Sequence, residues 1–299
     1  MLKLVNKLFE KVFMADKWNI GIIEQSATNL IEQRKLKNIV WLKEDNIDYA
    51  ADPFISDINN QTTIYYEELN FWNGKGKIMM MEGVDFKSKR KVSGIIPSSI
   101  HLSYPYLFQL DKELYCIPET SNAKEVGLYN VDFSKPCLLI KNKVLLSGKE
   151  YVDSSIIFYN DKYWLFSSIS ENYNQLYIFY SSSIDGDYQE HKLNPITVER
   201  EACRGAGSLF IVDDFIYRPT QNPTKCYGGS IQINKIVVLT ETEYKTDPVF
   251  EILPDKYYDR GIHHISFSND TIVVDGKRRI FKFFMPIKKT VKVFRKYMV

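Results

Sequence analysis

Two aspartates, a tyrosine and a histidine stand at the same step of a repeated pattern in this sequence. Asp52, Tyr104, Asp153 and His263 each occupy the second position of a short run, and successive runs begin about 50 residues apart. Making or breaking a glycosidic bond usually requires two carboxyl groups on opposite sides of the anomeric carbon. Asp52 and Asp153 are therefore candidates for catalysis on a carbohydrate, with the phenol and the imidazole as neighbouring polar groups.

Five runs of this kind open a series of strand-forming segments. The openers are residues 51–55, 103–107, 152–156, 205–209 and 262–266, and second strands follow at 64–68, 114–119, 163–168, 215–221 and 271–275. A third strand often follows, at 76–82, 126–132, 176–183 and 230–236. A repeat of about 50 residues is the size of one four-stranded propeller blade. We predict an all-β fold, a five-bladed β-propeller with a short helical N-terminal segment.

The early strand at residues 18–24 precedes the first opener and is predicted to complete the last blade, which removes an exposed sheet edge. A β-sandwich is the alternative fold, but it would need hairpins at closer and less regular spacing. Only the start of the chain and the stretch 26–37 interrupt the strands with a helical pattern. We divide the chain into an amphipathic N-terminal segment (1–17), the propeller (18–280) and a basic C-terminal tail (281–299).

In a propeller the innermost strands face a central channel, so residues at the same step of successive blades form a ring. The four residues named above are expected to converge there. The second strands supply a further ring, made of Glu67 or Glu68, Glu119, Ser168, Gln221 and Asp275. Strand alternation leaves open which of the two adjacent glutamates faces inward, and Glu68 is taken as the candidate. The structural alternative is that Asp52 and Asp153 only cap turns.

Further polar and aromatic residues are candidates for contact with the substrate. They are His101, Ser103, Tyr104, Arg204, Arg218, Gln221, His263, Glu68 and Trp72. The guanidinium groups of Arg204 and Arg218 suit a phosphate or a sugar acid, or else form salt bridges with nearby carboxylates. Tyr104 and Trp72 could stack on a sugar ring, whereas Trp164, inside an apolar strand, is more typical of the core.

Metal and cofactor signatures are weak in this sequence. His101, His263 and His264 could form a metal site, but their carboxylate neighbours do not fix a ligand geometry. There is no glycine-rich phosphate loop before a helix, no GxSxG elbow and no HExxH. We therefore expect neither a metal nor a cofactor. These absences also argue against a nucleotide-sugar transferase built on a Rossmann-like sheet, while a propeller that uses an activated sugar donor stays open.

Composition and charge limit which ligands and which cellular location we expect. The chain has 299 residues and a formal net charge of +2, which argues against a binder of duplex nucleic acid. The four cysteines show neither CxxC pairing nor zinc-type spacing with histidine, so we expect reduced, mostly buried thiols. The opening MLKLVNKLFEKVF is too short and too interrupted by charge for a signal peptide. We expect a cytoplasmic location.

Several short strings carry a family resemblance. They are ADPF, HLSYP, PET, VDSS, RPTQN and GIHH, spread between Trp18 and Asp275. The chain resembles the domain at the N-terminus of plant glucosamine inositolphosphorylceramide transferases and its bacterial relatives. That domain is similar to the five-bladed propellers of glycoside hydrolase families 43, 32 and 130. The resemblance implies the propeller fold and a carbohydrate ligand.

The resemblance also implies roles for single residues. In the family 43 pattern, Asp52 matches the general base, and Asp153 matches the residue that tunes a partner's pKa and holds the sugar. The general acid of that pattern is a fourth-blade glutamate, and the matching stretch here reads CRGAG. Glu201 lies just before that stretch and Glu119 lies on another blade, which makes Glu119 the third catalytic candidate. In the plant proteins, sugar transfer is expected in a different, C-terminal domain.

Both chain ends are basic and apolar, so they could dock on an anionic membrane surface or pack on the propeller with their lysines in water. We expect a saccharide, sugar phosphate or nucleotide sugar as ligand. The first interpretation is an intracellular enzyme that makes or remodels glycosidic bonds, by transfer or phosphorolysis, in surface-glycan biosynthesis. The alternatives are a glycoside hydrolase of the family 43 type and a non-catalytic sugar-binding module that assists a glycosyltransferase.

Overall fold

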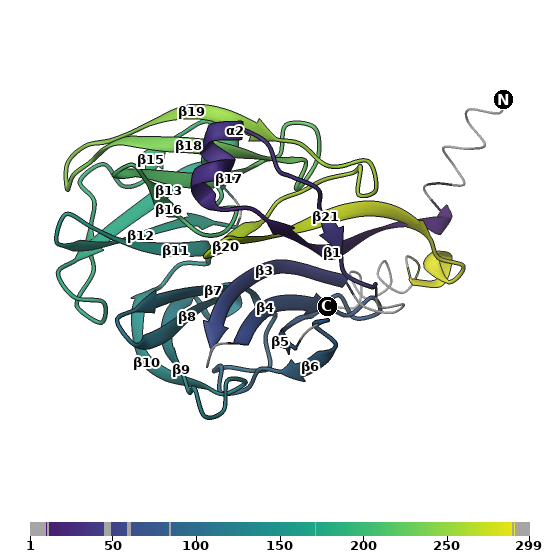
Figure 1. The fold of residues 1–299 in the computed structure, drawn as a ribbon. Coiled ribbons are helices and arrows are strands. Elements are labelled where there is room, and N and C mark those ends of the chain that lie inside the picture. The colour runs from purple at the N-terminus through teal and green to yellow at the C-terminus, as the bar shows by residue number, and fades with distance from the viewer. Residues whose placement is uncertain are drawn as a thin grey trace.

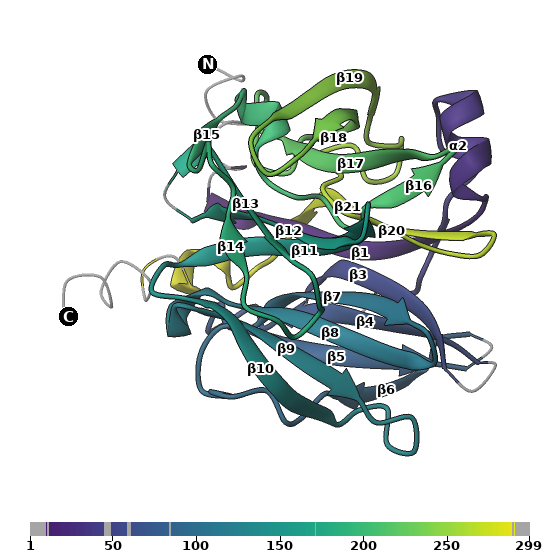
Figure 2. The ribbon, with the colours of Figure 1, turned by 90° about the vertical axis from the view of Figure 1, so that its left-hand side faces the viewer.

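Five antiparallel sheets form a ring of blades, as the sequence predicts (Figures 1 and 2). The structure is a computed structural model that describes residues 10, 12–44, 49–58, 61–83, 85–170, 172–288 and 290. Most of the expected N-terminal segment and the end of the basic tail therefore lie outside the described residues. Among the described residues, every helix is too short or too polar to cross a bilayer.

The strands follow the order of the sequence from the inner to the outer edge of blades 1 to 4. Blade 1 holds β3 (Tyr49–Ile58), β4 (Gln61–Leu69), β5 (Gly76–Glu82) and β6 (Ser88–Lys91). Blade 2 holds β7 (Ser103–Leu110), β8 (Glu113–Thr120), β9 (Glu125–Val131) and β10 (Leu139–Ser147). Blade 3 holds β11 (Tyr151–Tyr159), β12 (Lys162–Ile169), β13 (Asn172–Ser181), β14 (Gln189–Glu190) and β15 (Ile196–Thr197). Blade 4 holds β16 (Phe210–Val212), β17 (Phe215–Asn222), β18 (Ser230–Leu239) and β19 (Tyr244–Ile252).

Blade 5 joins the two ends of the chain. It holds β20 (Ile265–Ser268), β21 (Thr271–Phe281), β1 (Met14–Glu24) and β2 (Val40–Trp41). β1 pairs with β21 along its whole length, from Met14 opposite Phe281 to Glu24 opposite Thr271. The predicted closure of the ring by the early strand is thereby confirmed, and the strand begins four residues earlier than the sequence pattern indicated.

One α-helix, α2 (Ala27–Gln33), packs beside β16 of blade 4 (Figure 2). It starts where the Ser26 side chain accepts a hydrogen bond from the N–H of Asn29, a common N-cap arrangement. It ends at Arg34, whose backbone is left-handed with φ 53°. Its buried Leu30 joins a core cluster with Phe210 and Ile231. The helix is shorter than the stretch 26–37 suggested, because the cap at Arg34 stops it.

The inner strands of blades 1, 2 and 3 each carry a bulge at the same step. Two residues oppose one in each case: the register jumps between Ala51 and Phe54, between Ser103 and Tyr106, and between Val152 and Ser155. The first bulged residues are Asp52, Tyr104 and Asp153, with φ of 50°, 42° and 51°. A left-handed backbone at a residue other than glycine costs roughly 1–3 kcal/mol and often accompanies a functional site.

The apolar core lies between neighbouring blades. One cluster joins blades 1, 2 and 3 through residues such as Phe54, Tyr129 and Leu165, and another joins blades 4 and 5. Trp164 is buried between blades 3 and 4 with Phe166 and Ile216, so it belongs to the core, as the sequence suggested. All four cysteines are free; two are buried, one is partly buried and Cys226 is exposed.

Candidate functional site

Carboxylates from four blades gather at the propeller axis. They are Asp52 and Glu67 of blade 1, Glu119 of blade 2, Asp153 of blade 3 and Asp275 of blade 5. All are buried except Glu119, which is half-buried. A buried charge is costly unless it is paired or hydrogen-bonded, so the contacts around these groups determine what the cluster can do.

Three of these carboxylates accept the backbone N–H of a bulged residue on the next blade. Asp275 Oδ2 accepts from Asp52 N at 3.2 Å, and Asp52 Oδ2 accepts from Tyr104 N at 3.3 Å. Glu119 Oε2 accepts from Asp153 N at 3.2 Å. The contacts therefore run in sequence through blades 5, 1, 2 and 3. The bulges turn these N–H groups toward the axis, where the carboxylates satisfy them.

Arg204 connects the fourth blade to this chain of contacts. It lies in the segment before β16, and its Nε donates to Asp153 Oδ2 at 2.6 Å. Gln221 on β17 donates from Nε2 to the carbonyl of Gly205 at 2.9 Å and more distantly to the same Asp153 oxygen at 3.4 Å. In the part of the chain that the structure describes, blade 4 contributes cationic and amide groups to the cluster and no carboxylate.

His263 and Asp275 form the buried ion pair of blade 5. Their Nδ1 and Oδ2 atoms lie 2.6 Å apart, and Asp52 Oδ1 lies 4.0 Å from the same Nδ1. Burial opposes the charged form of His263, but the Asp275 carboxylate raises the net pKa of this imidazole above its usual value. Burial likewise opposes ionisation of Asp275, while the imidazolium holds the pKa of Asp275 below its usual value. Trp18 stacks on the imidazole with ring centroids 4.0 Å apart.

Three other axial carboxyls have raised pKa values. Burial, with the charges of Asp275 and Asp153, raises the pKa of Asp52 to about 7 despite the nearby imidazole. Burial and Asp153 raise the pKa of Glu119 to about 7, although Arg204 opposes the shift. Burial and the surrounding carboxylates raise the pKa of Glu67 well above its usual range. General acids and bases act best when their pKa lies near the working pH, so these groups suit proton transfer.

Two predicted contact residues lie in the core instead of the site. The ring of Tyr104 is only 1% exposed and packs against Phe54 and His264. Its hydroxyl donates to the Gly207 carbonyl at 3.0 Å and accepts from the Gly207 N–H at 2.9 Å. The expected stacking of this ring on a sugar is therefore corrected, and only the backbone N–H of Tyr104 reaches the axial carboxylates.

Arg218 is the second such residue, because its guanidinium is used inside blade 4. It donates to the carbonyls of Ala202 at 2.8 Å and Cys203 at 2.6 Å and is buried against the ring of Phe166. These bonds fix the short 3₁₀ turn that precedes Arg204. Arg218 thus supports the position of Arg204, and its own expected contact with a ligand phosphate is corrected.

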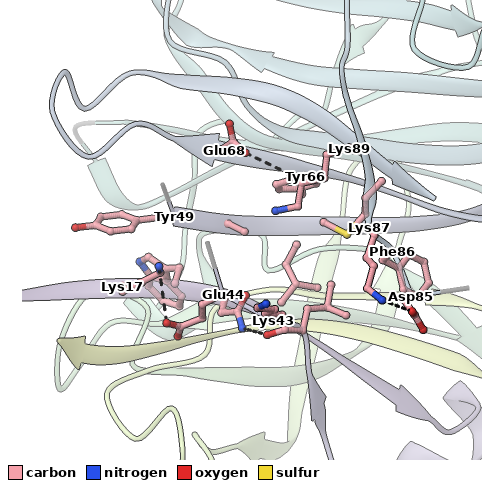
Figure 3. A pocket seen from close by; sticks show the side chains of 16 residues that line it. Lys17, Lys43, Glu44, Tyr49, Tyr66, Glu68, Asp85, Phe86, Lys87 and Lys89 are labelled. Carbon is pink, nitrogen blue, oxygen red and sulfur yellow. Dashed lines mark hydrogen bonds and ion pairs between the residues drawn. The ribbon is translucent and has the colours of Figure 1, made fainter. Parts of the chain in front are cut away.

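The adjacent glutamates of β4 point in different directions. Glu67 faces the axis, whereas Glu68 pairs with Lys77 at 2.6 Å between Oε1 and Nζ. Glu68 also lines a separate pocket of about 260 Å³ between blades 5 and 1, where a dashed line joins it to Tyr66 in Figure 3. The choice of Glu68 for the axial site is therefore wrong, because strand alternation places its side chain on the other face.

The register of the strands explains why Glu67 is the axial residue. Glu67 pairs with Ala51, Glu119 with Ser103 and Ser168 with Val152, an identical offset of 16 residues in three blades. Counting that offset from the openers would have identified Glu67 from the sequence. Asp275 belongs to the ring predicted from the second strands, whereas Trp18 was not predicted there because its position depends on the pairing of β1 with β21.

The remaining predicted residues lie near the cluster or on its rim. Ser103 is buried at the start of β7, opposite Glu119. His101 accepts the Gly76 N–H on Nδ1 at 2.9 Å and places Nε2 3.3 Å from Glu67 Oε1. Trp72 is 50% exposed in the turn after β4, and its ring centroid lies 6.4 Å from that of Phe284.

A metal ion is poorly suited to the closest group of potential ligands. Atoms of Asp52, His263 and Asp275 lie within 4.8 Å of one another. However, Asp275 Oδ2 is engaged by the imidazole, and Asp275 Oδ1 accepts the N–H groups of His263 and His264, each at 3.0 Å. An ion bound there would have to separate the buried pair. His264 is buried, which lowers its pKa to about 3 and keeps it neutral.

Comparison with known proteins points to one family. The family model described as glucosamine inositolphosphorylceramide transferase 1, N-terminal, matches residues 42–259. The glucosamine inositolphosphorylceramide transferase 1 of Oryza sativa subsp. japonica is 34% identical over 210 residues, which cover 67% of this chain and 28% of that protein. The chain thus spans little more than a quarter of the length of this curated relative.

Solved structures share the fold at low sequence identity. The α-L-arabinofuranosidase PaAbf62A from Podospora anserina, solved in complex with cellotriose, has a TM-score of 0.58 and 13% identity, covering 77% of this chain and 82% of that one. An exo-β-1,3-galactanase from Phanerochaete chrysosporium, solved with β-1,3-galactotriose, has a TM-score of 0.50 and 12% identity, covering 73% and 52%. At these identities the likeness shows the fold.

Proposed function

Since the chain belongs to the family of glucosamine inositolphosphorylceramide transferase N-terminal domains, we propose that its axial cluster binds a saccharide and acts on a glycosidic bond. The proposed protein is an intracellular enzyme of surface-glycan biosynthesis that works by glycosyl transfer or phosphorolysis. The observation that carries the proposal is the convergence of carboxyl groups with raised pKa values on one axis. Such groups can exchange protons with a sugar near neutral pH.

Asp52 is the proposed general base. Its Oδ2 is held by the Tyr104 N–H, and the pKa of about 7 leaves a large fraction of the carboxyl ionised in the cytoplasm. Asp153 is held by Arg204 and lies between Arg204 and Glu119, so it is placed to hold the sugar and to set the charge around its neighbours. Glu119 completes the catalytic set as the carboxyl that fixes the backbone of Asp153.

A phosphate group on the ligand would find one suitable partner at the axis. Arg204 uses Nε for Asp153, and its Cζ atom lies 6.0 Å from the ring centroids of the exposed residues Tyr173 and Tyr227. A guanidinium between aromatic rings suits a sugar phosphate or a nucleotide sugar. Carboxylates around it would repel the phosphates of duplex nucleic acid.

Two further functions have a specific observation behind them. The fold is shared with glycoside hydrolases, which favours hydrolysis as the second candidate. Arg204 places a cation at the axial position of blade 4, which favours a non-catalytic module that presents an acceptor sugar to a glycosyltransferase. Hydrolysis predicts turnover with water as acceptor, and the module predicts saccharide binding without turnover.

We also propose peripheral contact with the inner face of the membrane. Exposed apolar side chains gather on one rim: Trp72, Phe281, Phe283, Phe284 and Ile287. Trp72 follows β4 and Phe281 ends β21, so both stand at the ends of strands that carry axial carboxylates. The nearby tail is cationic; from Gly276 to Val299 it has nine lysines and arginines and no acid. Aromatic groups beside lysines suit an anionic bilayer surface.

Calorimetry tests the carbohydrate proposal. The protein is titrated with nucleotide sugars and neutral oligosaccharides, and turnover is measured with each compound that binds. We expect saturable binding that Asp52→Asn abolishes or weakens, and a loss of turnover of at least ~100-fold with the fold intact. Glu68→Gln is the matched control, since Glu68 lies on the other face of β4. Failure of every saccharide to bind would exclude the proposal.

A further inference from the structure

Glu67 is the most enclosed of the axial carboxyls that have no cationic partner in the cluster. Its side chain is 12% exposed and projects from β4 toward four other carboxylates, those of Asp52, Glu119, Asp153 and Asp275. A buried carboxylate is usually stabilised by a cationic partner, and the groups that act most strongly on Glu67 are carboxylates. The charges around Glu67 therefore favour its neutral, protonated form.

The position of His101 indicates which oxygen of Glu67 carries that proton. The Gly76 N–H donates to His101 Nδ1 at 2.9 Å, so in the neutral imidazole the hydrogen sits on Nε2. Nε2 lies 3.3 Å from Glu67 Oε1, so the nitrogen that carries the hydrogen is next to that oxygen. Burial and the nearby Lys75 lower the pKa of His101, which keeps the ring neutral. Because a donor nitrogen lies beside Oε1, we place the proton of the carboxyl on Oε2.

Gly76 makes this arrangement possible. A Cβ atom at position 76 would lie closer than 3.0 Å to Glu67 Oε1, to His101 Cε1 and to the carbonyl oxygen of Leu102. Only glycine allows the backbone of β5 to approach the carboxyl and the imidazole so closely. Three separate segments, β4, β5 and the residues before β7, therefore meet to fix one carboxyl group.

Glu119 differs from Glu67 in how its oxygens are used. Its Oε2 accepts the Asp153 N–H at 3.2 Å, and its Oε1 accepts the Ser121 hydroxyl at 3.1 Å. Arg204 lies nearby and also favours the ionised form. Both oxygens of Glu119 are thus occupied as acceptors, which suits a carboxylate that positions Asp153. The contrast makes Glu67 the better source of a proton.

We propose that Glu67 is the proton donor of the axial site and that His101 is the residue that positions it. The proposal rests on the function proposed above. As the glycosidic C–O bond breaks, its electron pair stays on the leaving oxygen, which takes the proton from Glu67 Oε2 and departs as a hydroxyl group. The anomeric carbon forms its new bond to the oxygen of an alcohol acceptor, whose proton passes to Asp52. Proton exchange with water then restores protonated Glu67 and ionised Asp52.

Nuclear magnetic resonance of protein with ¹³C-labelled glutamate carboxyls tests the proton directly. The Glu67 signal is assigned by its loss in Glu67→Gln, with Glu68→Gln as the control for the neighbouring residue. We expect Glu67 to remain protonated through pH 7 and the His101 nitrogens to report a hydrogen on Nε2. A Glu67 signal that titrates near the ordinary glutamate value of about 4.3 would overturn the proposal, whatever the protein binds.

Kinetics test the donor role separately. With aryl glycosides of graded leaving-group acidity, Glu67→Gln should lose ~100-fold or more for poor leaving groups and little for acidic ones. His101→Gln keeps an N–H donor near Nε2, so it should retain more activity than His101→Leu and preserve the pH profile. If Asp52→Asn abolishes turnover while Glu67→Gln does not, the donor assignment is wrong and the proposed function stands. If the wild-type protein turns over no saccharide, both fail.

Discussion

Arg204 and Asp153 form a 2.6 Å hydrogen-bonded ion pair that connects blade 4 to blade 3 at the propeller axis. Both side chains are buried for most of their surface, at 15% and 5% exposure. Burial opposes the charge of Arg204, but Asp153 and the other neighbouring groups raise the net pKa of the guanidinium. The guanidinium therefore stays charged and pairs with the only axial acid that meets an arginine in the described residues.

Removing this arginine should leave a buried carboxylate without a partner. Arg204→Gln is expected to lower the free energy of unfolding by roughly 3–5 kcal/mol, measured by urea denaturation. Arg90→Gln is the matched control, since its pair with Glu82 lies at the surface and contributes about 1 kcal/mol or less. Combining Arg204→Leu with Asp153→Leu should recover much of the loss. An Arg204→Gln protein as stable as the control variant would show that the pair is not structural.

Stability should fall as the pH rises from 5 to 8. Asp52 and Glu119 have pKa values of about 7 in the folded protein, above those of the unfolded chain, so the folded state binds more protons in this window. The raised pKa of His263 acts in the same direction. We expect a decrease on the order of a few kcal/mol, measured by denaturation at each pH. Asp52→Asn and Glu119→Gln should each flatten the profile; an unchanged slope in both would contradict the protonation of these groups.

Tyr104 should matter for stability and not for ligand affinity. Tyr104→Phe removes the hydroxyl that bonds both backbone groups of Gly207, so unfolding should become easier by roughly 1–3 kcal/mol. The phenyl ring still fills the core, and saccharide affinity measured by calorimetry should stay within twofold. If the variant folds normally and binds sugar at least tenfold more weakly, the phenol contacts the ligand after all.

The exposed aromatic rim should bind anionic membranes. In co-sedimentation, the full chain is expected to bind vesicles that contain phosphatidylglycerol, less so at high salt, and to ignore pure phosphatidylcholine. Phe283→Ser with Phe284→Ser should weaken binding about tenfold, since the rings are 69% and 54% exposed. Phe158→Ser with Phe215→Ser is the control, because these rings have similar exposure near other turns. If both double variants weaken vesicle binding equally, this rim is not the membrane-binding surface.

The sequence predicts the ring because each blade repeats one local pattern that has a defined length. The openers at 51–55, 103–107 and 152–156 begin inner strands, and β1 closes blade 5 as expected. The axial position of Asp52, Asp153 and His263 is predictable because residues at the same step of successive repeats lie around one axis. Asp52 and Asp153 keep their side chains there through bulges with left-handed backbone.

The direction of single side chains was harder to predict. Tyr104 shares the phase of Asp52 and the same bulge, yet its ring reaches Gly207 through the core. A phenol is apolar enough to be buried once its hydroxyl is satisfied, whereas a carboxylate is held at the polar axis. The choice between Glu67 and Glu68 follows from the 16-residue offset between an opener and its paired strand, which selects Glu67 opposite Ala51. The role of Arg218 is hard to predict because its partners, the Ala202 and Cys203 carbonyls, are backbone groups of a turn.

The pairing of β1 with β21 has a consequence for biosynthesis. β1 leaves the ribosome well before its partner strand, which starts at Thr271 and ends at Phe281. At roughly 5–20 residues per second, the nascent chain carries an unpaired β1 for tens of seconds while the other blades emerge. The apolar residues of this strand, such as Ile20 and Ile23, have no sheet to join during that time. Blade 5 can therefore form only after Thr271–Phe281 has been synthesised, and a nascent chain stalled before Thr271 would be a strong target for chaperones and proteases.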